Sequence, residues 1–233
     1  MNYVKDNISY HEHLNPEVWD DWSMDREVRL RLMQIARLFI KYLELPGFKL
    51  EDIVLTGSMA NYNYTRYSDF DIHVVTRYSD LSADDIVEAF YQAKKRIWND
   101  NHDITIFGHE TELYVEDIKS PPVSAGVFSL MQGEWLKRPS FNPPDIDDSA
   151  VNSKVRDVMH QIDDAINDNN YSYTKRIMDK IKNMRQNGLS KEGEFGVENL
   201  TFKILRNVGY IGRLHKAYTE QQDKELSLYR NEL

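Results

Sequence analysis

The sequence predicts an α+β domain followed by an α-helical domain. Three observations support this prediction. Helical periodicity and short β-like runs alternate up to about residue 141, the segment Asn142-Pro143-Pro144-Asp145 has the composition of a connector, and only helical periodicity follows it. We therefore expect residues 1–141 to form a domain with a small mixed sheet and helices, and residues 142–233 to form a helical domain.

Two helices are expected in the first domain. Apolar residues recur at helical spacing from about residue 24 to residue 43, and Ser23 is placed to cap the first turn. A second helix is expected over residues 83–98. The apolar stripe expected on this second helix consists of Ile86, Phe90, Ala93 and Ile97.

Four short runs in the same domain have the composition of strands. The runs 53–55 and 70–75 are rich in Ile and Val, and the runs 103–107 and 111–115 are rich in aliphatic and aromatic residues. Gly108 lies between the last two runs, which predicts that a tight turn joins them. Together these runs predict a small sheet.

Three helices are expected beyond the connector. Apolar residues recur three or four positions apart over residues 151–166, 177–184 and 197–211. Glu198 falls in the first turn of the third of these helices, where the helix dipole favours a carboxylate. We therefore expect a structural role for Glu198.

The composition excludes several classes of site. The chain has 233 residues, 29 Lys and Arg against 38 Asp and Glu, and no cysteine, which excludes disulfides, thiolate zinc sites and cysteine nucleophiles. Residues 151–233 hold 14 basic and 12 acidic side chains, whereas residues 1–150 hold 15 and 26. Because phosphate contacts need Lys and Arg, the acidic first part argues against broad nucleic-acid binding there. It is compatible with phosphate binding through metal ions.

The sequence gives no sign of membrane insertion. No apolar run approaches the roughly 18 residues that a membrane span requires. The first 13 residues contain no apolar core of the kind found in signal peptides. We therefore expect a cytoplasmic protein with no membrane partner.

The stretch from Gly57 to Asp71 carries the most informative chemistry. Gly57-Ser58 follows the first strand run, where backbone N–H groups and a hydroxyl can bind phosphate oxygens. After a spacer of ten residues, Asp69 and Asp71 open the second strand run. Alternate side chains of a strand share a face, so both carboxylates should lie about 7 Å apart on the face opposite Phe70. Left unpaired they would repel each other, which favours a divalent cation between them.

A third carboxylate is expected from the last strand run. Glu112 alternates with Leu113 and should therefore point away from the core, toward the two aspartates. A shift in register would change this face, and Glu110, Glu116 and Asp117 lie nearby as alternatives. Three carboxylates on adjacent strands beside a Gly-Ser loop are typical of a site for two-metal phosphoryl or nucleotidyl transfer.

This order of residues resembles the signature of the DNA polymerase β-like nucleotidyltransferase superfamily. The resemblance comprises Gly-Ser, a spacer of ten, Asp-x-Asp and a later strand carboxylate, and the order of elements over residues 24–117 is also similar. The stretch Arg66-Tyr67-Ser68-Asp69 resembles the Ser-Asp-x-Asp form common in smaller members. In the tail, residues 193–207 resemble segments of nucleotidyltransferase-like proteins encoded by tailed phages, which specifies no substrate.

The resemblance implies an activity and a set of roles. Asp69 and Asp71 would hold two Mg²⁺ or Mn²⁺ ions, and Glu112 would complete the site of the second ion. The nucleotide-binding residues that it implies are Gly57, Ser58 and Ser68. The implied reaction is in-line attack of a hydroxyl on the α-phosphate of an NTP such as ATP, with release of pyrophosphate.

The acceptor of the nucleotide is less determined. An RNA end is favoured over a protein side chain or a small molecule, because the segment 175–185 carries five positive charges and one negative. The same segment can equally be a solvated helix face, and Lys203 and Arg206 are further candidate cations. Two other functions stay open: a cyclic or linear oligonucleotide synthase, and a catalytically silent nucleotidyltransferase fold that binds a nucleotide or a partner.

Several aromatic side chains near the motif are expected to have structural roles. Tyr62, Tyr64 and Tyr67 could stack on a base, but loop tyrosines more often pack locally, and we expect local packing here. His73 shares the predicted face of Asp71 and is expected to hydrogen-bond a carboxylate rather than to act in catalysis.

Overall fold

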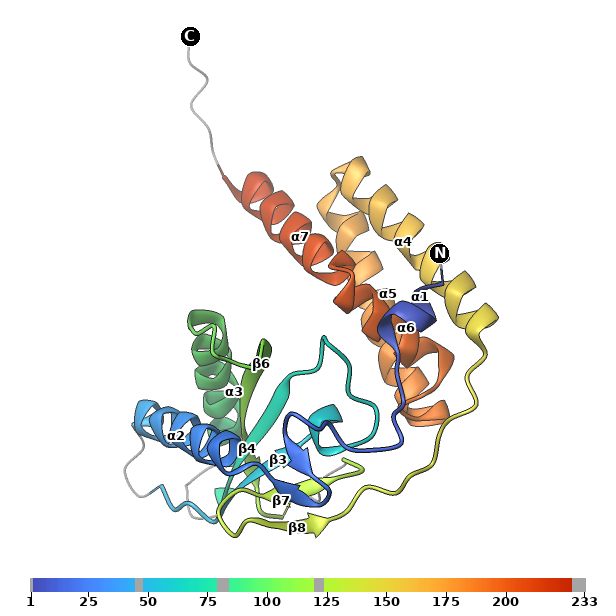
Figure 1. The fold of residues 1–233 in the computed structure, drawn as a ribbon. Helices are drawn as coiled ribbons and strands as arrows, with labels where there is room; N and C mark the ends of the chain where they lie inside the picture. The colour runs from blue at the N-terminus through green and yellow to red at the C-terminus, as the bar shows by residue number, and fades with distance from the viewer. Residues whose placement is uncertain (1, 45–47, 79–83, 120–123, 228–233) are drawn as a thin grey trace. The chain divides into compact units, whose positions relative to one another are not determined.

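The computed structural model describes residues 2–44, 48–78, 84–119 and 124–227. It is α+β, with a mixed sheet in the first part of the chain and helices throughout (Figure 1). Its contacts divide the chain into two units. The sheet unit comprises Ser9–Asn142, and the helical unit comprises Met1–Ile8 together with Pro143–Leu233.

The sheet unit contains strands and helices in alternation. Its strands are β1 (Trp19–Asp20), β2 (Ser23–Met24), β3 (Asp52–Thr56), β4 (Phe70–Thr76), β5 (Thr105–Ile106), β6 (His109–Asp117), β7 (Val127–Ser129) and β8 (Glu134–Lys137). Its helices are α2 (Arg26–Leu43), the short 3₁₀ helix η1 (Ser58–Ala60) and α3 (Asp84–Asn101). The four strands that the sequence predicts are confirmed as β3 to β6.

The main sheet has the order β5-β6-β4-β3-β7-β8. Only β4 and β6 are parallel, and the other neighbours are antiparallel, which makes the sheet mixed. In β4 the apolar side chains Phe70, Ile72 and Val74 are buried, whereas Asp71 and His73 are only partly buried. One face of the sheet is therefore the core face, and the other carries polar groups.

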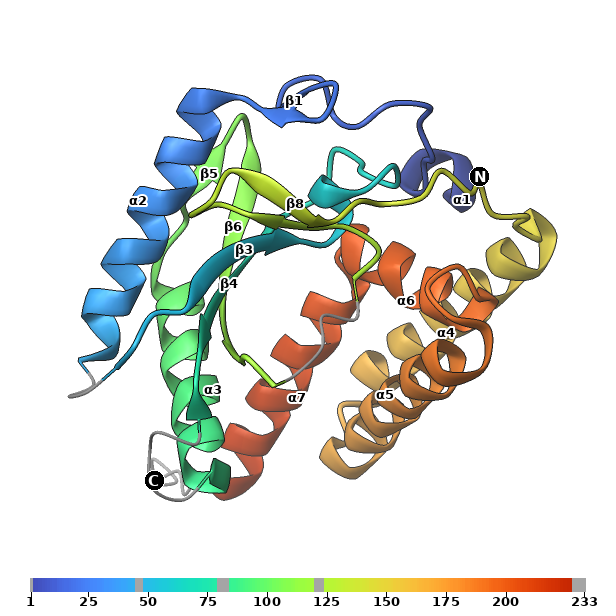
Figure 2. The same cartoon turned by 90° about the horizontal axis from the view of Figure 1, so that it is seen from below.

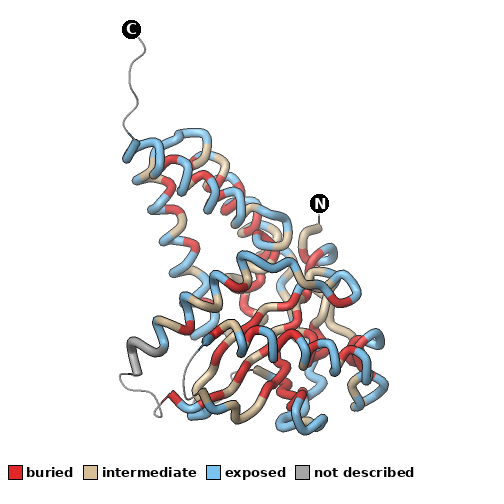
Figure 3. The backbone as a smooth tube through the Cα atoms, turned by 90° about the vertical axis from the view of Figure 1, so that its left-hand side faces the viewer, coloured by how far each residue is buried: buried red, intermediate tan, exposed pale blue. Residues whose placement is uncertain are grey.

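The helices α2 and α3 bury their apolar sides in the same core as β4 (Figure 2). Buried residues of both helices belong to this core, including Phe39 of α2 and Trp98 of α3, whose ring centroids are 5.5 Å apart. Along the backbone, buried residues gather in the strands, where they alternate with partly buried ones (Figure 3).

The structure corrects three local predictions. The N-cap of α2 is Asp25, whose carboxylate accepts the N–H groups of Glu27 and Val28, so Ser23 is not the cap. An aspartate two residues nearer to the helix competes successfully because its acceptor reaches the free N–H groups. The helix predicted over 197–211 is broken at Gly209, whose φ of 81° is left-handed.

The third correction concerns the buried side of α3. Tyr91 and Trp98 are buried, with exposed fractions of 1% and 7%, whereas Ile97 is 49% exposed and Ala93 is also exposed. The predicted stripe was therefore wrong for Ala93 and Ile97. The two large aromatic rings have more apolar area to remove from water, and they set the rotation of the helix.

The helical unit consists of α1 and four longer helices. The bounds are α1 (Tyr3–Asn7), α4 (Asp148–Asp168), α5 (Tyr171–Glu192), α6 (Val197–Asn207) and α7 (Tyr210–Leu226). Residues 1–8 were expected in the first domain, but Val4 is 5% exposed and belongs to the core of the helical unit. Glu198 lies in the first turn of α6, as predicted, and pairs with Lys154 at 2.8 Å. None of the helices in the described part of the chain is both long and apolar enough to span a membrane.

Candidate active site

Three carboxylates meet near the start of β4. The strands β4 and β6 run parallel, and their register places Asp71 directly opposite Glu112. Asp69 precedes β4, and one oxygen from each of the three side chains lies within 4.8 Å of the other two. All three residues are partly buried. The structure thus brings together the three carboxylates that the sequence pattern singles out.

The same register separates the alternative acids from this cluster. Glu116 lies opposite Val75, four positions further along β6 than Glu112, and its Oε2 is 3.0 Å from Nδ1 of His73. Asp117 lies opposite Thr76, and Glu110 is exposed next to the β5–β6 turn. The prediction that His73 contacts a carboxylate is confirmed, and the partner is Glu116.

Gly57 allows the loop after β3 to approach the carboxylates closely. Its φ of 74° lies in the left-handed region, and a Cβ atom built on it would lie 1.8 Å from Oδ2 of Asp71. Its N–H donates to Oγ of Ser124 at 3.2 Å. Only glycine fits this position, because any side chain would collide with the carboxylate of Asp71.

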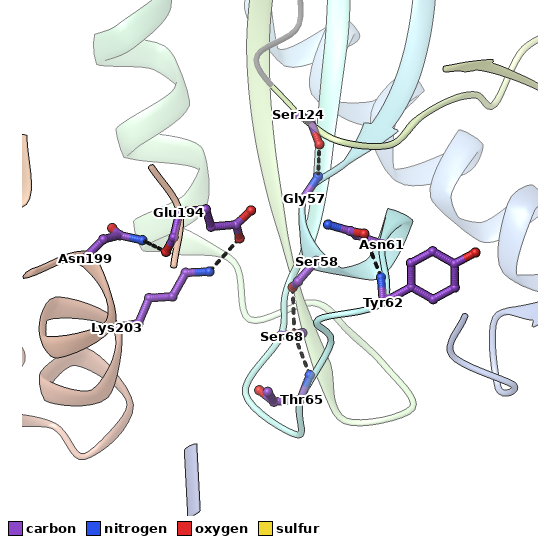
Figure 4. A network of polar contacts seen from close by, with 10 residues as sticks. All are labelled: Gly57, Ser58, Asn61, Tyr62, Thr65, Ser68, Ser124, Glu194, Asn199 and Lys203. Atoms are coloured by element: carbon purple, nitrogen blue, oxygen red, sulfur yellow. Dashed lines mark hydrogen bonds and ion pairs between the residues drawn. The ribbon is translucent and has the colours of Figure 1, made fainter. Parts of the chain in front are cut away.

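Ser58 and Ser68 are joined across the loop by a hydrogen bond between their hydroxyls (Figure 4). The Ser58 hydroxyl donates to Oγ of Ser68 at 2.7 Å, and Ser68 Oγ also accepts the N–H of Thr65 at 2.9 Å. The backbone oxygen of Ser68 contacts Nδ1 of His109 at 2.7 Å. Ser68 is 7% exposed, so its present role in the structure is to hold the loop and the hydroxyl of Ser58.

Tyr114 is a residue of this site that the sequence reasoning missed. Its hydroxyl donates a hydrogen bond to Oε2 of Glu112, and its ring stacks on His73 with centroids 4.6 Å apart. Burial, followed by the charges of Asp71 and Glu112, raises the pKa of Tyr114 well above its usual range. Tyr114 therefore keeps its proton and holds one oxygen of Glu112 in place. The strand alternation that placed Glu112 on this face also places Tyr114 there, which is the signal that could have found it.

Lys95 is the second missed residue, and α3 positions it. The free edge of β6 is covered by Asn99 of α3, whose side chain donates to the Leu113 oxygen and accepts the Leu113 N–H. One turn earlier, the ammonium group of Lys95 lies 3.5 Å from the centroid of the Tyr114 ring. Burial lowers the pKa of Lys95, while the charges of Glu112 and Asp71 act in the opposite direction. A cation thus lies near the acidic cluster.

The donor set of the cluster fits a hard divalent cation. Mg²⁺ and Mn²⁺ prefer oxygen ligands, and carboxylates on one small area are the usual protein ligands for them. Three partly buried carboxylates would repel one another without a compensating charge. The residues present can therefore hold the metal ions that the sequence resemblance implies.

Other predicted binding residues have partners within their own unit. Lys203 forms an ion pair with Glu194 at 2.8 Å in the helical unit (Figure 4). The five cations of the segment 175–185 in α5 are exposed, and two of them have partners in the helical unit: Lys180 donates to Gln161 at 2.6 Å, and Arg185 lies 4.3 Å from the ring centroid of Phe202. The expectation of local packing is confirmed for Tyr62, which is 7% exposed and packs against Phe141.

The chain has little similarity to known proteins in sequence or in structure. No known family model and no curated protein sequence matches the chain. Among solved structures, it is similar to a STING-associated CdnE c-di-GMP synthase from Capnocytophaga granulosa, with 10% identity over 87% of this chain and 84% of the other. The TM-score of this match is 0.23, and a likeness of this size supports no conclusion on fold or function.

Proposed function

We propose that the sheet unit is the catalytic domain of a metal-dependent nucleotidyltransferase. It would move an NMP from an NTP to a hydroxyl acceptor and release pyrophosphate. The observation that carries the proposal is the convergence of Asp69, Asp71 and Glu112 within 4.8 Å, from two strands whose register pairs Asp71 with Glu112. Gly57, at the start of the loop after β3, lies against Asp71 of the same cluster.

The three carboxylates would hold two Mg²⁺ or Mn²⁺ ions, with Asp69 and Asp71 serving both and Glu112 completing one site. When bound, such ions stabilise developing negative charge and help to ionise an attacking hydroxyl. Tyr114 holds Oε2 of Glu112 by a hydrogen bond and thereby fixes the orientation of this carboxylate. Lys95 offsets part of the negative charge of the cluster.

Ser58 would bind a phosphate oxygen of the nucleotide. Its hydroxyl proton now points to Ser68, which also accepts the N–H of Thr65. If Ser68 donated to Ser58 instead, the Ser58 proton would become free for a phosphate oxygen, and no hydroxyl would lose its partner. Ser68 would in this way support nucleotide binding indirectly, through its hydrogen bond with Ser58.

The acceptor class is proposed to be the end of an RNA. The support is the exposed set of cations on α5, which offers the charge that an RNA backbone requires. A protein side chain and a small molecule are the competing acceptors, and the assay below separates them.

The proposal is tested by a transfer assay with four α-labelled NTPs, Mg²⁺ or Mn²⁺, and total RNA, the protein itself or no acceptor. We expect label in RNA that disappears in Asp69→Asn, while Glu116→Gln, whose acid lies outside the cluster, retains transfer. A labelled small product without acceptor would identify an oligonucleotide synthase instead. Nucleotide binding without transfer under any condition would contradict the proposal and indicate a silent binding module.

A further inference from the structure

The sheet unit also has a pocket that shares no residue with the carboxylate cluster. Its volume is about 630 Å³, and it is lined by the segment around β1 and β2 and by the loop that follows η1. Its aromatic walls are formed by Trp19, Trp22, Tyr62 and Tyr64. We call it the aromatic pocket.

The aromatic walls are held in place by specific contacts. Trp19 is 4% exposed, donates its indole N–H to the Met59 oxygen at 2.8 Å and stacks on Trp135 with centroids 4.6 Å apart. Tyr64 stacks on His11 at 3.9 Å, and the ring of that histidine contacts the Tyr64 oxygen at 3.0 Å. The walls are therefore preformed, and a ligand would not have to order them.

The charged part of the lining is acidic, and two histidines, His11 and His13, also line the pocket. Glu12, Asp20 and Asp21 line the pocket and are exposed, and its lining among the described residues includes no Lys or Arg. Within residues 2–44, 48–78, 84–119 and 124–227, none of these three carboxylates forms an ion pair. Asp21 adopts a left-handed φ of 51° in the turn between β1 and β2, which presents Asp21 and Trp22 side by side. The pocket thus combines unpaired negative charge with electron-rich ring faces.

One ring of the pocket already contacts a cation of the protein. The guanidinium of Arg138 lies 4.8 Å from the centroid of Trp22, although Arg138 is not among the lining residues. In this contact the indole of Trp22 already accepts a positive charge over its ring. The aromatic rings and the carboxylates of the pocket therefore both favour a positively charged ligand.

We propose that the aromatic pocket binds a primary alkylammonium group, as carried by polyamines and by lysine side chains. The ammonium would contact Asp20, Asp21 and Glu12, while the methylene chain would lie against the rings of Trp22 and Tyr64. The net charge of −9 of the chain also favours the approach of a cation. This site does not depend on the proposed transferase activity.

The test measures tryptophan fluorescence of the full chain during titration with 1,4-diaminobutane. The neutral control ligand is 1,4-butanediol, which has the same chain without charge. We expect a saturable change with the diamine and none with the diol. The double variant Asp20→Asn/Asp21→Asn should weaken diamine binding at least about tenfold, since charged hydrogen bonds contribute more than neutral ones. Asparagine tolerates a left-handed φ, so the turn should persist.

Control variants and further ligands separate specific from diffuse binding. Glu17→Gln removes an exposed acid that does not line the pocket and should leave the diamine affinity unchanged. Spermidine and a short lysine peptide distinguish a polyamine from a lysine side chain as the natural source. Equal responses to the diamine and the diol, equal losses in Glu17→Gln and the double variant, or no response to the diamine would each overturn the proposal.

Discussion

At the scale of a single residue, Gly57 brings the loop after β3 against the carboxylate cluster. Its left-handed backbone lets the loop turn against Asp71, and the missing Cβ leaves room for the carboxylate. The sequence singles out Gly57 through its position after a strand run. The closeness of Asp71, however, depends on the pairing of Thr56 with Asp71 across β3 and β4, which spacing does not reveal.

Gly57→Ala should therefore disturb the cluster as well as the backbone. Alanine at this φ costs about 1–2 kcal/mol of stability, and its methyl group would displace Asp71. The matched control is Gly108→Ala, because Gly108 has a φ of 81° and nothing within 4 Å of a built Cβ. We expect both variants to lose stability in thermal unfolding because both glycines have a positive φ, and we expect loss of Mn²⁺ affinity only in Gly57→Ala. Equal Mn²⁺ affinity in the two variants would contradict this account.

Sequence reasoning identified some residues of the site and missed others for a physical reason. Asp69 and Asp71 follow from local alternation along one strand, and Glu112 from alternation along another. Lys95 lies on a helix, and its approach to Tyr114 follows from the docking of Asn99 on the edge of β6. Such contacts depend on tertiary placement, which periodicity does not encode.

At the scale of elements, α3 shows how packing decides between two helix faces. Its periodicity is compatible with a stripe through Ile97 or with one through Trp98, and the structure buries Trp98. The ring of Trp98 packs against Phe39 and Tyr42 of α2, with centroid distances of 5.5 Å and 5.3 Å. The strands β3, β4 and β6 were predictable because their apolar runs are clear, and the two-residue strand β5 because Gly108 marks its turn into β6. The two-residue strands β1 and β2 have neither signal.

Two adjacent substitutions test the rotation of α3. Trp98→Ala should lower the free energy of unfolding by about 3–5 kcal/mol, because it removes a large buried ring. Ile97→Ala should change it by less than about 0.5 kcal/mol, because Ile97 is 49% exposed. Chemical denaturation of both variants gives the comparison. A larger loss of unfolding free energy in Ile97→Ala than in Trp98→Ala would show that α3 buries Ile97 instead of Trp98.

At the scale of the whole molecule, the N-terminal residues belong with helices that are distant in sequence. The N–H of Tyr3 donates to Oδ1 of Asn152 at 2.7 Å, and the side chain of Asn152 donates to Oδ1 of Asn2 at 3.0 Å. The proline-rich connector after residue 141 can be recognised in the sequence. The packing of the five-residue helix α1 against α4 cannot. A short segment carries too little periodicity to reveal its partner.

Val4→Ala should therefore loosen the helical unit and spare the sheet. The loss of two buried methyl groups should cost about 2 kcal/mol. Hydrogen exchange followed by mass spectrometry should show faster exchange in peptides of α4 and α6, with β3 and β4 unchanged. Faster exchange confined to the strands would contradict the assignment of residues 1–8 to the helical unit.

The central claim is that the cluster of Asp69, Asp71 and Glu112 binds divalent metal ions. The most direct test is Mn²⁺ titration by calorimetry, with and without a non-hydrolysable NTP analogue, of the wild type, Glu112→Gln and Glu116→Gln. The two glutamates share a strand, but only Glu112 belongs to the cluster, and glutamine at 116 can still accept a hydrogen bond from His73. We expect Mn²⁺ affinity to fall at least about tenfold in Glu112→Gln and to be retained in Glu116→Gln, since a ligating charge is lost only in the first. Equal affinities in the two variants, or no Mn²⁺ binding by the wild type, would contradict the account.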